Sequence, residues 1–190
     1  MKNLNIILSA FVLAFFTFSC SSDDDSGNPD PGGNDGYGSY EYNIDGVGSY
    51  TSAPEDMAYA VYSTDPEDTE VDGVSGVYIV NGSSSSGNHI MNLTLIEING
   101  EIVTAINSDA DDSSGAYISH LDNGMYFSVS GQIEVLHASH GPLNGNNVAT
   151  AKVKLKLNGQ FMDSSFNEES LKSVSASINA DTPPLFYPGL

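Results

Sequence analysis

The stretch AKVKLKL, Ala151–Leu157, alternates strictly between apolar residues and lysines. Side chains on a β-strand point to opposite faces in turn, so this period of two predicts a strand with one buried and one solvated face. The buried face would hold Ala151, Val153, Leu155 and Leu157. The solvated face would hold Lys152, Lys154 and Lys156, which form a row because residues two apart point the same way.

Further strands are predicted before this stretch, in segments rich in β-branched and aromatic residues. Asn-Gly dipeptides at 99–100, 123–124 and 158–159 predict hairpins, since both residues tolerate the positive φ of a type I′ turn. One short helix is expected near Ser165–Lys172. The segments predicted as strands are VYIV (77–80), MNLTLIEI (91–98), EIVTAI (101–106), AYISHL (116–121), MYFSVS (125–130) and QIEVLH (132–137).

Many short strands joined by hairpins, with almost no helix, indicate an all-β fold. We expect an antiparallel β-sandwich built from hairpins. The alternative is a lipocalin-like up-and-down β-barrel, because adjacent hairpins also build a meander.

The start of the chain has a different character. Lys2 precedes an apolar run from about residue 6 to residue 18, and the small Ser19 precedes Cys20. A charged start, an apolar stretch and a small residue before a cut site are typical of a secretory signal. Cys20 is the only cysteine, so it has no partner for an internal disulfide.

This pattern resembles the signal peptide of bacterial lipoproteins, in which the cysteine after the cut carries lipid. Ser22, Asp23, Asp24 and Asp25 resemble the surface-export signal of Bacteroidota lipoproteins. The resemblance implies a signal peptide at residues 1–19, lipidation of Cys20, and an outer-membrane protein exposed at the cell surface and anchored to the lipid bilayer. The alternative is an ordinary secretory signal with a free cysteine.

The composition changes again after Cys20. Residues 20–36 are dominated by Gly, Pro, Ser, Asn and Asp, which predicts a disordered acidic tether, and residues 37–190 have the size of a single domain. The chain has 25 acidic residues and five basic ones, for a net charge of −20. Nucleic acid is therefore an unsuitable partner, whereas calcium and cationic partners are compatible.

The lysine row allows three interpretations. The lysines protect an edge strand from pairing with other chains, or they pair across strands with carboxylates such as Glu134. The third interpretation is a cationic strip, Lys152, Lys154 and Lys156, for an anionic ligand such as an acidic polysaccharide.

Metal binding has only weak candidates. His137 and His140 lie three residues apart in a segment expected to be a loop after a strand, but a zinc site needs three or four ligands. The acidic segments 68–73 and 108–115 make calcium possible, although their spacing departs from the EF-hand pattern. We expect no resident cofactor.

No motif for nucleophilic catalysis is present. We therefore expect a non-catalytic binding or assembly role, in capture of an extracellular glycan or other polymer or in a complex with other surface proteins. This role follows from the resemblance. The alternatives are a secreted hydrolase, recognisable by a deep pocket with facing carboxylates, and a structural lipoprotein with no small ligand. The proline-rich segment 183–190 is expected to be a strap across the domain or a docking tail.

Overall fold

The computed structural model describes residues 38–53, 56–65, 67–68, 70–80, 89–110, 113–120, 123–167 and 170–181. All of them belong to one unit of the chain, residues 34–190. The predicted signal peptide (1–19), Cys20, the export signal from Ser22 to Asp25, the rest of the tether to residue 36 and the segment 183–190 lie outside the described residues. No described helix is long and apolar enough to cross a membrane.

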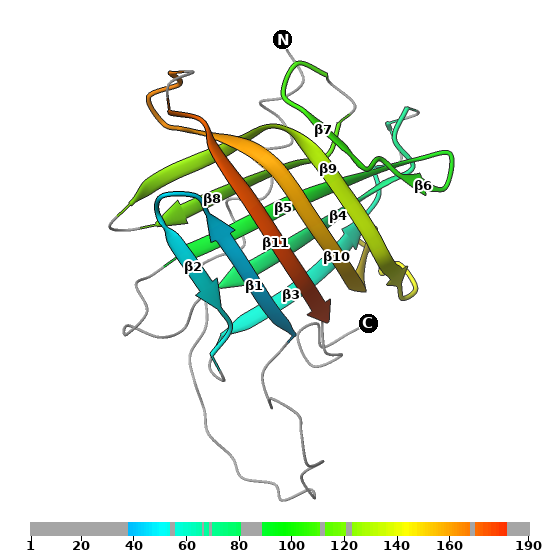
Figure 1. Cartoon of the computed structure of the whole chain (residues 1–190). Helices are drawn as coiled ribbons and strands as arrows, with labels where there is room; N and C mark the ends of the chain where they lie inside the picture. The colour runs from blue at the N-terminus through cyan, green and yellow to red at the C-terminus, as the bar shows by residue number, and fades with distance from the viewer. Residues whose placement is uncertain are drawn as a thin grey trace, which may run out of the picture. The chain divides into compact units, whose positions relative to one another are not determined.

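The fold is all-β, as predicted, and consists of antiparallel strands (Figure 1). The longest strands are β9 and β10, and β10 contains the alternating stretch Ala151–Leu157. The strands are β1 (Ser39–Ile44), β2 (Gly48–Thr51), β3 (Met57–Ser63), β4 (Gly73–Val80), β5 (His89–Ile98), β6 (Glu101–Ile102), β7 (Ala105–Asn107), β8 (Gly115–His120), β9 (Gly124–His140), β10 (Val148–Asp163) and β11 (Lys172–Asp181).

The strands form one large sheet that folds over into a β-sandwich. Its order is β2-β1-β11-β10-β3-β4-β5-β8-β9-β7, and β9 also pairs with β10. Figure 1 shows β2, β1, β11, β10 and β9 in a front layer and β3, β4, β5 and β8 behind it. The alternative, an up-and-down barrel, is not formed, because neighbouring strands in the sheet do not follow one another in the sequence. β1 pairs with β11, and one edge of β10 pairs first with β3 and then with β11.

The core lies between the two layers and is built by alternation. In β10 the inward residues Val153, Leu155 and Leu157 are at most 1% exposed, while the lysines between them are exposed. Facing them from the back layer are buried residues such as Ile79 of β4 and Leu93 of β5. Burial of these side chains supplies the main stabilisation, at roughly 1.5–3 kcal/mol for each large apolar residue.

Two of the three predicted hairpins are confirmed. Asn99 and Gly100 have φ values of 54° and 75° and connect β5 to β6, as a type I′ turn requires. The hairpin at Asn123-Gly124 joins β8 to β9, but Gly124 already belongs to β9 and pairs with His120. The dipeptide therefore ends this turn instead of forming its centre.

The third predicted hairpin, at Asn158-Gly159, is wrong. Strand β10 continues through both residues, and Gly159 pairs with Gly131 of β9. A Cβ on Gly131 would lie 2.5 Å from the carbonyl oxygen of Asn158, closer than real Cβ atoms come to a neighbour. Glycine is needed here because the two backbones approach closely, not because the chain turns.

The predicted helix near Ser165–Lys172 is also wrong. None of the described residues in this segment is α-helical, and Lys172 begins β11. Strands β1, β2, β3 and β11 were not predicted. β3 is MAYAVYS and β11 is KSVSASINAD, in which alanine and serine hold many positions and dilute the β-branched signal.

Candidate functional site

The three lysines of β10 lie at the centre of the front layer. β9 pairs with one edge of β10 over Ala151–Asp163, and β11 pairs with the other over Lys152–Phe161. The interpretation of a guarded edge strand is therefore wrong, because β10 has neighbours on both sides. We call the outward side chains here the lysine face: Lys152, Lys154 and Lys156 of β10, Glu134, His137 and Ser139 of β9, and Ser177, Asn179 and Asp181 of β11.

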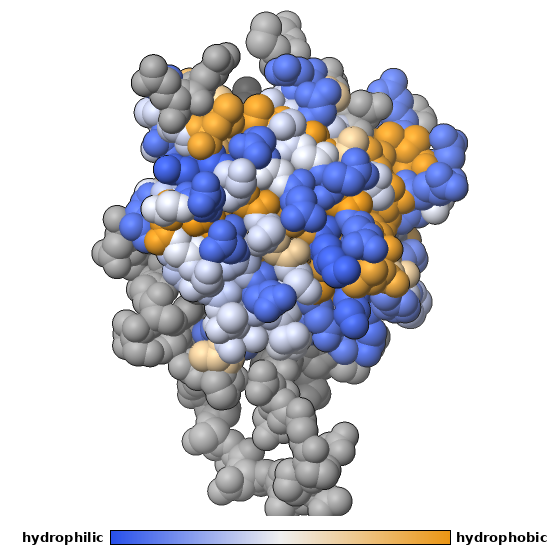
Figure 2. Space-filling model, viewed as in Figure 1, coloured by the Kyte–Doolittle hydropathy of each residue, from blue (hydrophilic) through white to orange (hydrophobic). Residues whose placement is uncertain are grey.

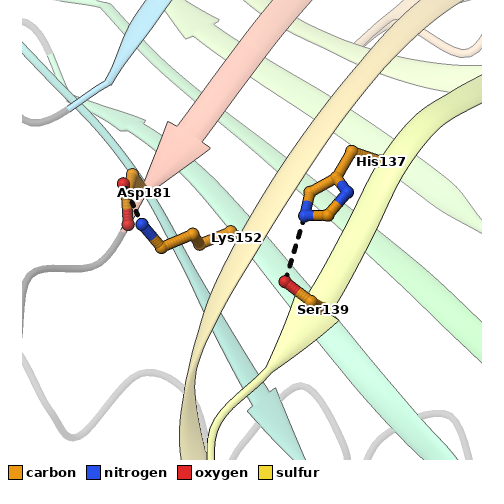
Figure 3. Close-up of polar contacts among 4 residues, drawn as sticks. All are labelled: His137, Ser139, Lys152 and Asp181. Carbon is orange, nitrogen blue, oxygen red and sulfur yellow. Dashed lines mark hydrogen bonds and ion pairs between the residues drawn. The ribbon is translucent and has the colours of Figure 1, made fainter.

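The outer two lysines have carboxylate partners across strands. Lys152 Nζ lies 2.8 Å from Asp181 Oδ2 (Figure 3), and Lys156 Nζ lies 3.3 Å from Glu134 Oε2. The pairing with Glu134 confirms the cross-strand interpretation for Lys156. All four side chains are 44–63% exposed, so each pair contributes at most about 1 kcal/mol.

Lys154, between them, has different neighbours. It stands opposite His137 of β9 and Asn179 of β11, and it makes no ion pair with any described residue. His137 Nε2 is 3.1 Å from Ser139 Oγ, which lies beside Lys152 in the register (Figure 3). The middle of the lysine face therefore presents an ammonium group flanked by an imidazole and an amide.

The prediction that His137 and His140 lie in a loop is wrong, since both belong to β9. The odd spacing of three sends their side chains to opposite faces. His140 stacks on the Tyr62 ring at 3.9 Å between centroids, and its Nδ1 donates to the carbonyl of Gly141 at 2.8 Å. The two imidazoles do not converge, and no group of three or more His, Asp or Glu within the described ranges is placed to hold a metal ion.

Side-chain oxygens in and beside the acidic loops accept hydrogen bonds from backbone N–H groups. Asp68 Oδ1 accepts from the backbone N–H groups of Glu70 and Val71, and Asp72 Oδ2 accepts from that of Gly100 at 2.8 Å. In the second loop, Asn107 Oδ1 accepts from the N–H of Asp109. The contacts of Asp68 and Asn107 are Asx-type turns, whereas Asp72 bridges to the turn between β5 and β6. The described parts of both loops bring no cluster of calcium ligands together.

Two shallow depressions lie on the front layer. The first, of about 360 Å³, lies over β2, β1, β11 and β10, between Glu41 and Lys156. The second, of about 410 Å³, lies over the Gly131–Gly159 pair, because neither glycine has a side chain to fill the surface. They share Asn158 and Ser175, and hydroxyl and amide groups dominate the rest of their lining. Figure 2 shows this face of the molecule, where hydrophilic and intermediate residues predominate.

The outer face of the back layer is different. Cross-strand register places Tyr59, Tyr78, Asn92, Tyr117 and Phe127 opposite one another, in that order, on β3, β4, β5, β8 and the first part of β9, which pairs with β8. Tyr59 and Tyr78 stack at 5.0 Å between ring centroids, and Tyr117 and Phe127 are 6.4 Å apart. We call this row, with Phe166, the aromatic face.

A third group of polar side chains is buried inside the sandwich. Tyr42 Oη lies 3.1 Å from His120 Nε2, the Tyr50 ring lies 4.5 Å from that of His120, and Tyr40 donates to Asp56 Oδ2 at 2.7 Å. Burial raises the pKa of the Tyr42 hydroxyl far above its usual value. Tyr42 therefore stays protonated and supplies a hydrogen bond to the interior.

Comparison with family models, with curated proteins and with solved structures finds no match to this chain. Neither the aromatic face nor the buried group was predicted. Both depend on which residues lie opposite each other on strands far apart in the sequence. The period-two spacing of Tyr40 and Tyr42 in β1 was the only sequence signal, and it pointed to the buried group.

Proposed function

We propose that this chain is a surface-anchored lipoprotein whose β domain binds an acidic extracellular polysaccharide, without catalysis, on the lysine face. The observation that supports this function is Lys154, an exposed ammonium group without a carboxylate partner among the described residues, at the centre of a broad polar face. A single carboxylate of a sugar acid would complete the row, since Lys152 and Lys156 already have partners.

The charge of the whole chain does not prevent this binding. Three of its five basic residues lie on the lysine face, although the chain carries 25 acidic ones. At physiological ionic strength the Debye length is about 8 Å, so distant acidic groups are largely screened while a contact to Lys154 is not. Binding is then decided by the nearest charges.

The surroundings of Lys154 suit the rest of a sugar chain. His137, Ser139, Asn179 and Ser177 supply donors and acceptors on either side of it. The adjoining depressions continue this surface with the side chains of Asn158, Gln160 and Ser175. Hydroxyl-rich polymers need many such modest hydrogen bonds, each of about 0.5–1.5 kcal/mol.

The anchor follows from the resemblance at the N-terminus. Each buried methylene of an acyl chain contributes about 0.8 kcal/mol, and durable anchoring takes more than one chain. Several acyl chains on Cys20 would hold the protein at the membrane, and the acidic segment up to residue 36 would keep the domain away from anionic headgroups. A domain held in this way can meet a polymer outside the cell.

Calorimetric titration of the mature chain with polygalacturonate tests the binding function. Lys154→Gln should weaken binding about fivefold, the effect of losing one exposed ion pair of roughly 1 kcal/mol. Lys172→Gln is the matched control, because it makes the same change of charge at the start of β11, away from the row. Equal affinities of the two variants would refute the assignment to the lysine face.

Mass spectrometry of the native protein tests the anchor separately. The mature chain should begin at Cys20 and carry acyl groups, and Cys20→Ser should release the protein from the membrane fraction. A mature chain that begins elsewhere, or a Cys20 without lipid, would contradict the anchor and leave the titration result unaffected.

A further inference from the structure

Phe166 adopts an unusual conformation for its residue type. It has a φ of 52° and its side chain is 68% exposed, in the connection between β10 and β11. Its N–H donates to the carbonyl of Asp163 at 3.0 Å, so it follows a tight turn at a position that normally takes glycine or asparagine. For a bulky residue this backbone conformation is strained, and such strain is concentrated at functional sites.

The exposed ring of Phe166 is part of a series of rings. It stacks on Phe127 with 5.5 Å between centroids and 23° between planes, and Phe127 lies 6.4 Å from Tyr117 on the neighbouring strand β8. One face of Phe166 is thus occupied by Phe127, and the high exposure of the side chain leaves the other open. The three rings lead from the β10–β11 connection to the middle of the aromatic face.

Polar groups lie at the inner end of this series. Asn92 Nδ2 donates to Tyr117 Oη at 2.5 Å, which leaves the tyrosine its own proton to donate. Asn92 Oδ1 is buried and accepts no hydrogen bond. Burial raises the pKa of Tyr117, only partly opposed by the hydrogen bond from Asn92, so the hydroxyl keeps this proton at neutral pH.

We infer that Phe166, Phe127 and Tyr117 form a binding site for a neutral hexopyranose chain, separate from the lysine face. A pyranose ring has a flat C–H face that packs on an aromatic ring and a rim of hydroxyl groups. The open face of Phe166 provides the surface for stacking, Phe127 supports that ring from its other side, and the Tyr117 hydroxyl provides a donor for the rim. No charged side chain occupies a described outward position of β4, β5 or β8 around Asn92 and Tyr117, which favours an uncharged sugar.

An apolar protein surface is the main competing occupant, because Ile90 and Met125 on the same face are each 38% exposed. Such a surface would cover the Tyr117 proton without offering an acceptor, and a buried unsatisfied donor costs about 1–3 kcal/mol. A sugar hydroxyl accepts this proton.

The test titrates the mature chain with hexamers of β-1,4-linked glucose and of β-1,4-linked mannose at millimolar concentration, followed by NMR of the aromatic rings. At least one hexamer should bind saturably, and Phe166→Gly should weaken it about tenfold through loss of the stacking surface. Phe166→Gly should not lower Tm, because glycine adopts this φ without strain. Leu143→Gly, at another exposed apolar side chain in a connection, is the matched control and should leave affinity unchanged.

Tyr117→Phe keeps the ring and removes the donor, so it should weaken binding about fivefold. Polygalacturonate should bind Phe166→Gly as well as it binds the unaltered chain, which separates this site from the lysine face. The proposal is overturned if neither hexamer binds, or if Phe166→Gly binds as tightly as Leu143→Gly. It is also overturned if sedimentation shows self-association that Phe166→Gly abolishes, because a second copy of the chain would then occupy the face.

Discussion

The two layers of the sandwich share one core and differ on their outer faces. In the front layer, the outward residues of β10 are three lysines followed by Asn158 and Gln160. In the back layer, the corresponding row across β3, β4, β5 and β8 consists of three tyrosines and one asparagine. Inward residues on both layers are apolar and nearly inaccessible to water.

This difference shows how an alternating strand separates two tasks. The inward positions determine whether the chain folds, because each loses its contact with water. The outward positions are free of that requirement, so they can carry charge on one layer and rings on the other. Four expected effects on stability test this division.

The largest effect is expected inside β10. Leu155→Ala should lower the free energy of unfolding by about 2–5 kcal/mol, because Leu155 is fully buried and its truncation leaves a cavity. Lys154→Ala, the adjacent outward residue, should change it by less than about 0.5 kcal/mol. Urea unfolding measures both, and similar losses for the two variants would contradict the division between the faces.

The next effect concerns the place where β9 and β10 approach most closely. Gly131→Ala should cost about 1–3 kcal/mol, since the new Cβ would lie 2.5 Å from the Asn158 carbonyl oxygen. Gly145→Ala is the matched control, because a Cβ there meets nothing within 4 Å. A Gly131→Ala protein as stable as the control would show that the strands are farther apart than the structure has them.

The third effect is a dependence of the free energy of unfolding on pH, caused by the buried tyrosine Tyr42. Burial raises the pKa of Tyr42 in the folded chain, so above pH 10 the unfolded chain loses a proton that the folded chain retains. The free energy of unfolding should therefore fall with rising pH, by about 1.4 kcal/mol per pH unit for this tyrosine. Burial raises the pKa of Tyr62, Tyr117 and Tyr126 in the same direction.

Tyr42→Phe removes one of these titrating groups, so its stability should decline less steeply between pH 10 and 11.5 in urea unfolding. Below pH 9 it should be less stable than the unaltered chain by about 0.5–1.5 kcal/mol, because the contact with His120 is lost. Equal slopes above pH 10 would mean that Tyr42 is not shielded from water.

The smallest effect is expected for the surface ion pairs. Lys152→Gln and Lys156→Gln should each lower the free energy of unfolding by no more than about 1 kcal/mol, and by less in high salt. Urea unfolding at two salt concentrations measures this. A larger loss would mean that these pairs help to hold the front layer together, against the view that outward residues are free for binding.

The sequence predicted those parts of the fold that depend on local alternation. The period of two in β10 predicted both faces of that strand correctly, because burial of one face is a property of the strand alone. The prediction of a hairpin from an Asn-Gly dipeptide failed at Asn158-Gly159. There the dipeptide that forms a turn at Asn99-Gly100 instead allows the close approach of β10 to Gly131. Only the neighbouring strand distinguishes the two uses.

The candidate site was predicted in part for the same reason. The row of Lys152, Lys154 and Lys156 followed from spacing, and Glu134 was named as an example of a carboxylate partner across strands. The difference between Lys154 and its two neighbours required the register with β9 and β11. The aromatic face joins five strands spread over Tyr59 to Phe127, and no local pattern contains that information.

Chemical-shift mapping of the isotope-labelled mature chain with polygalacturonate fragments tests the proposed function most directly. We expect the largest changes at Lys154, His137 and Asn179, with smaller ones along the outward residues of β10 and none at Tyr117 or Phe166. Changes centred on Lys172 or the aromatic face, or no saturable change at all, would contradict the assignment of acidic polysaccharide binding to the lysine face.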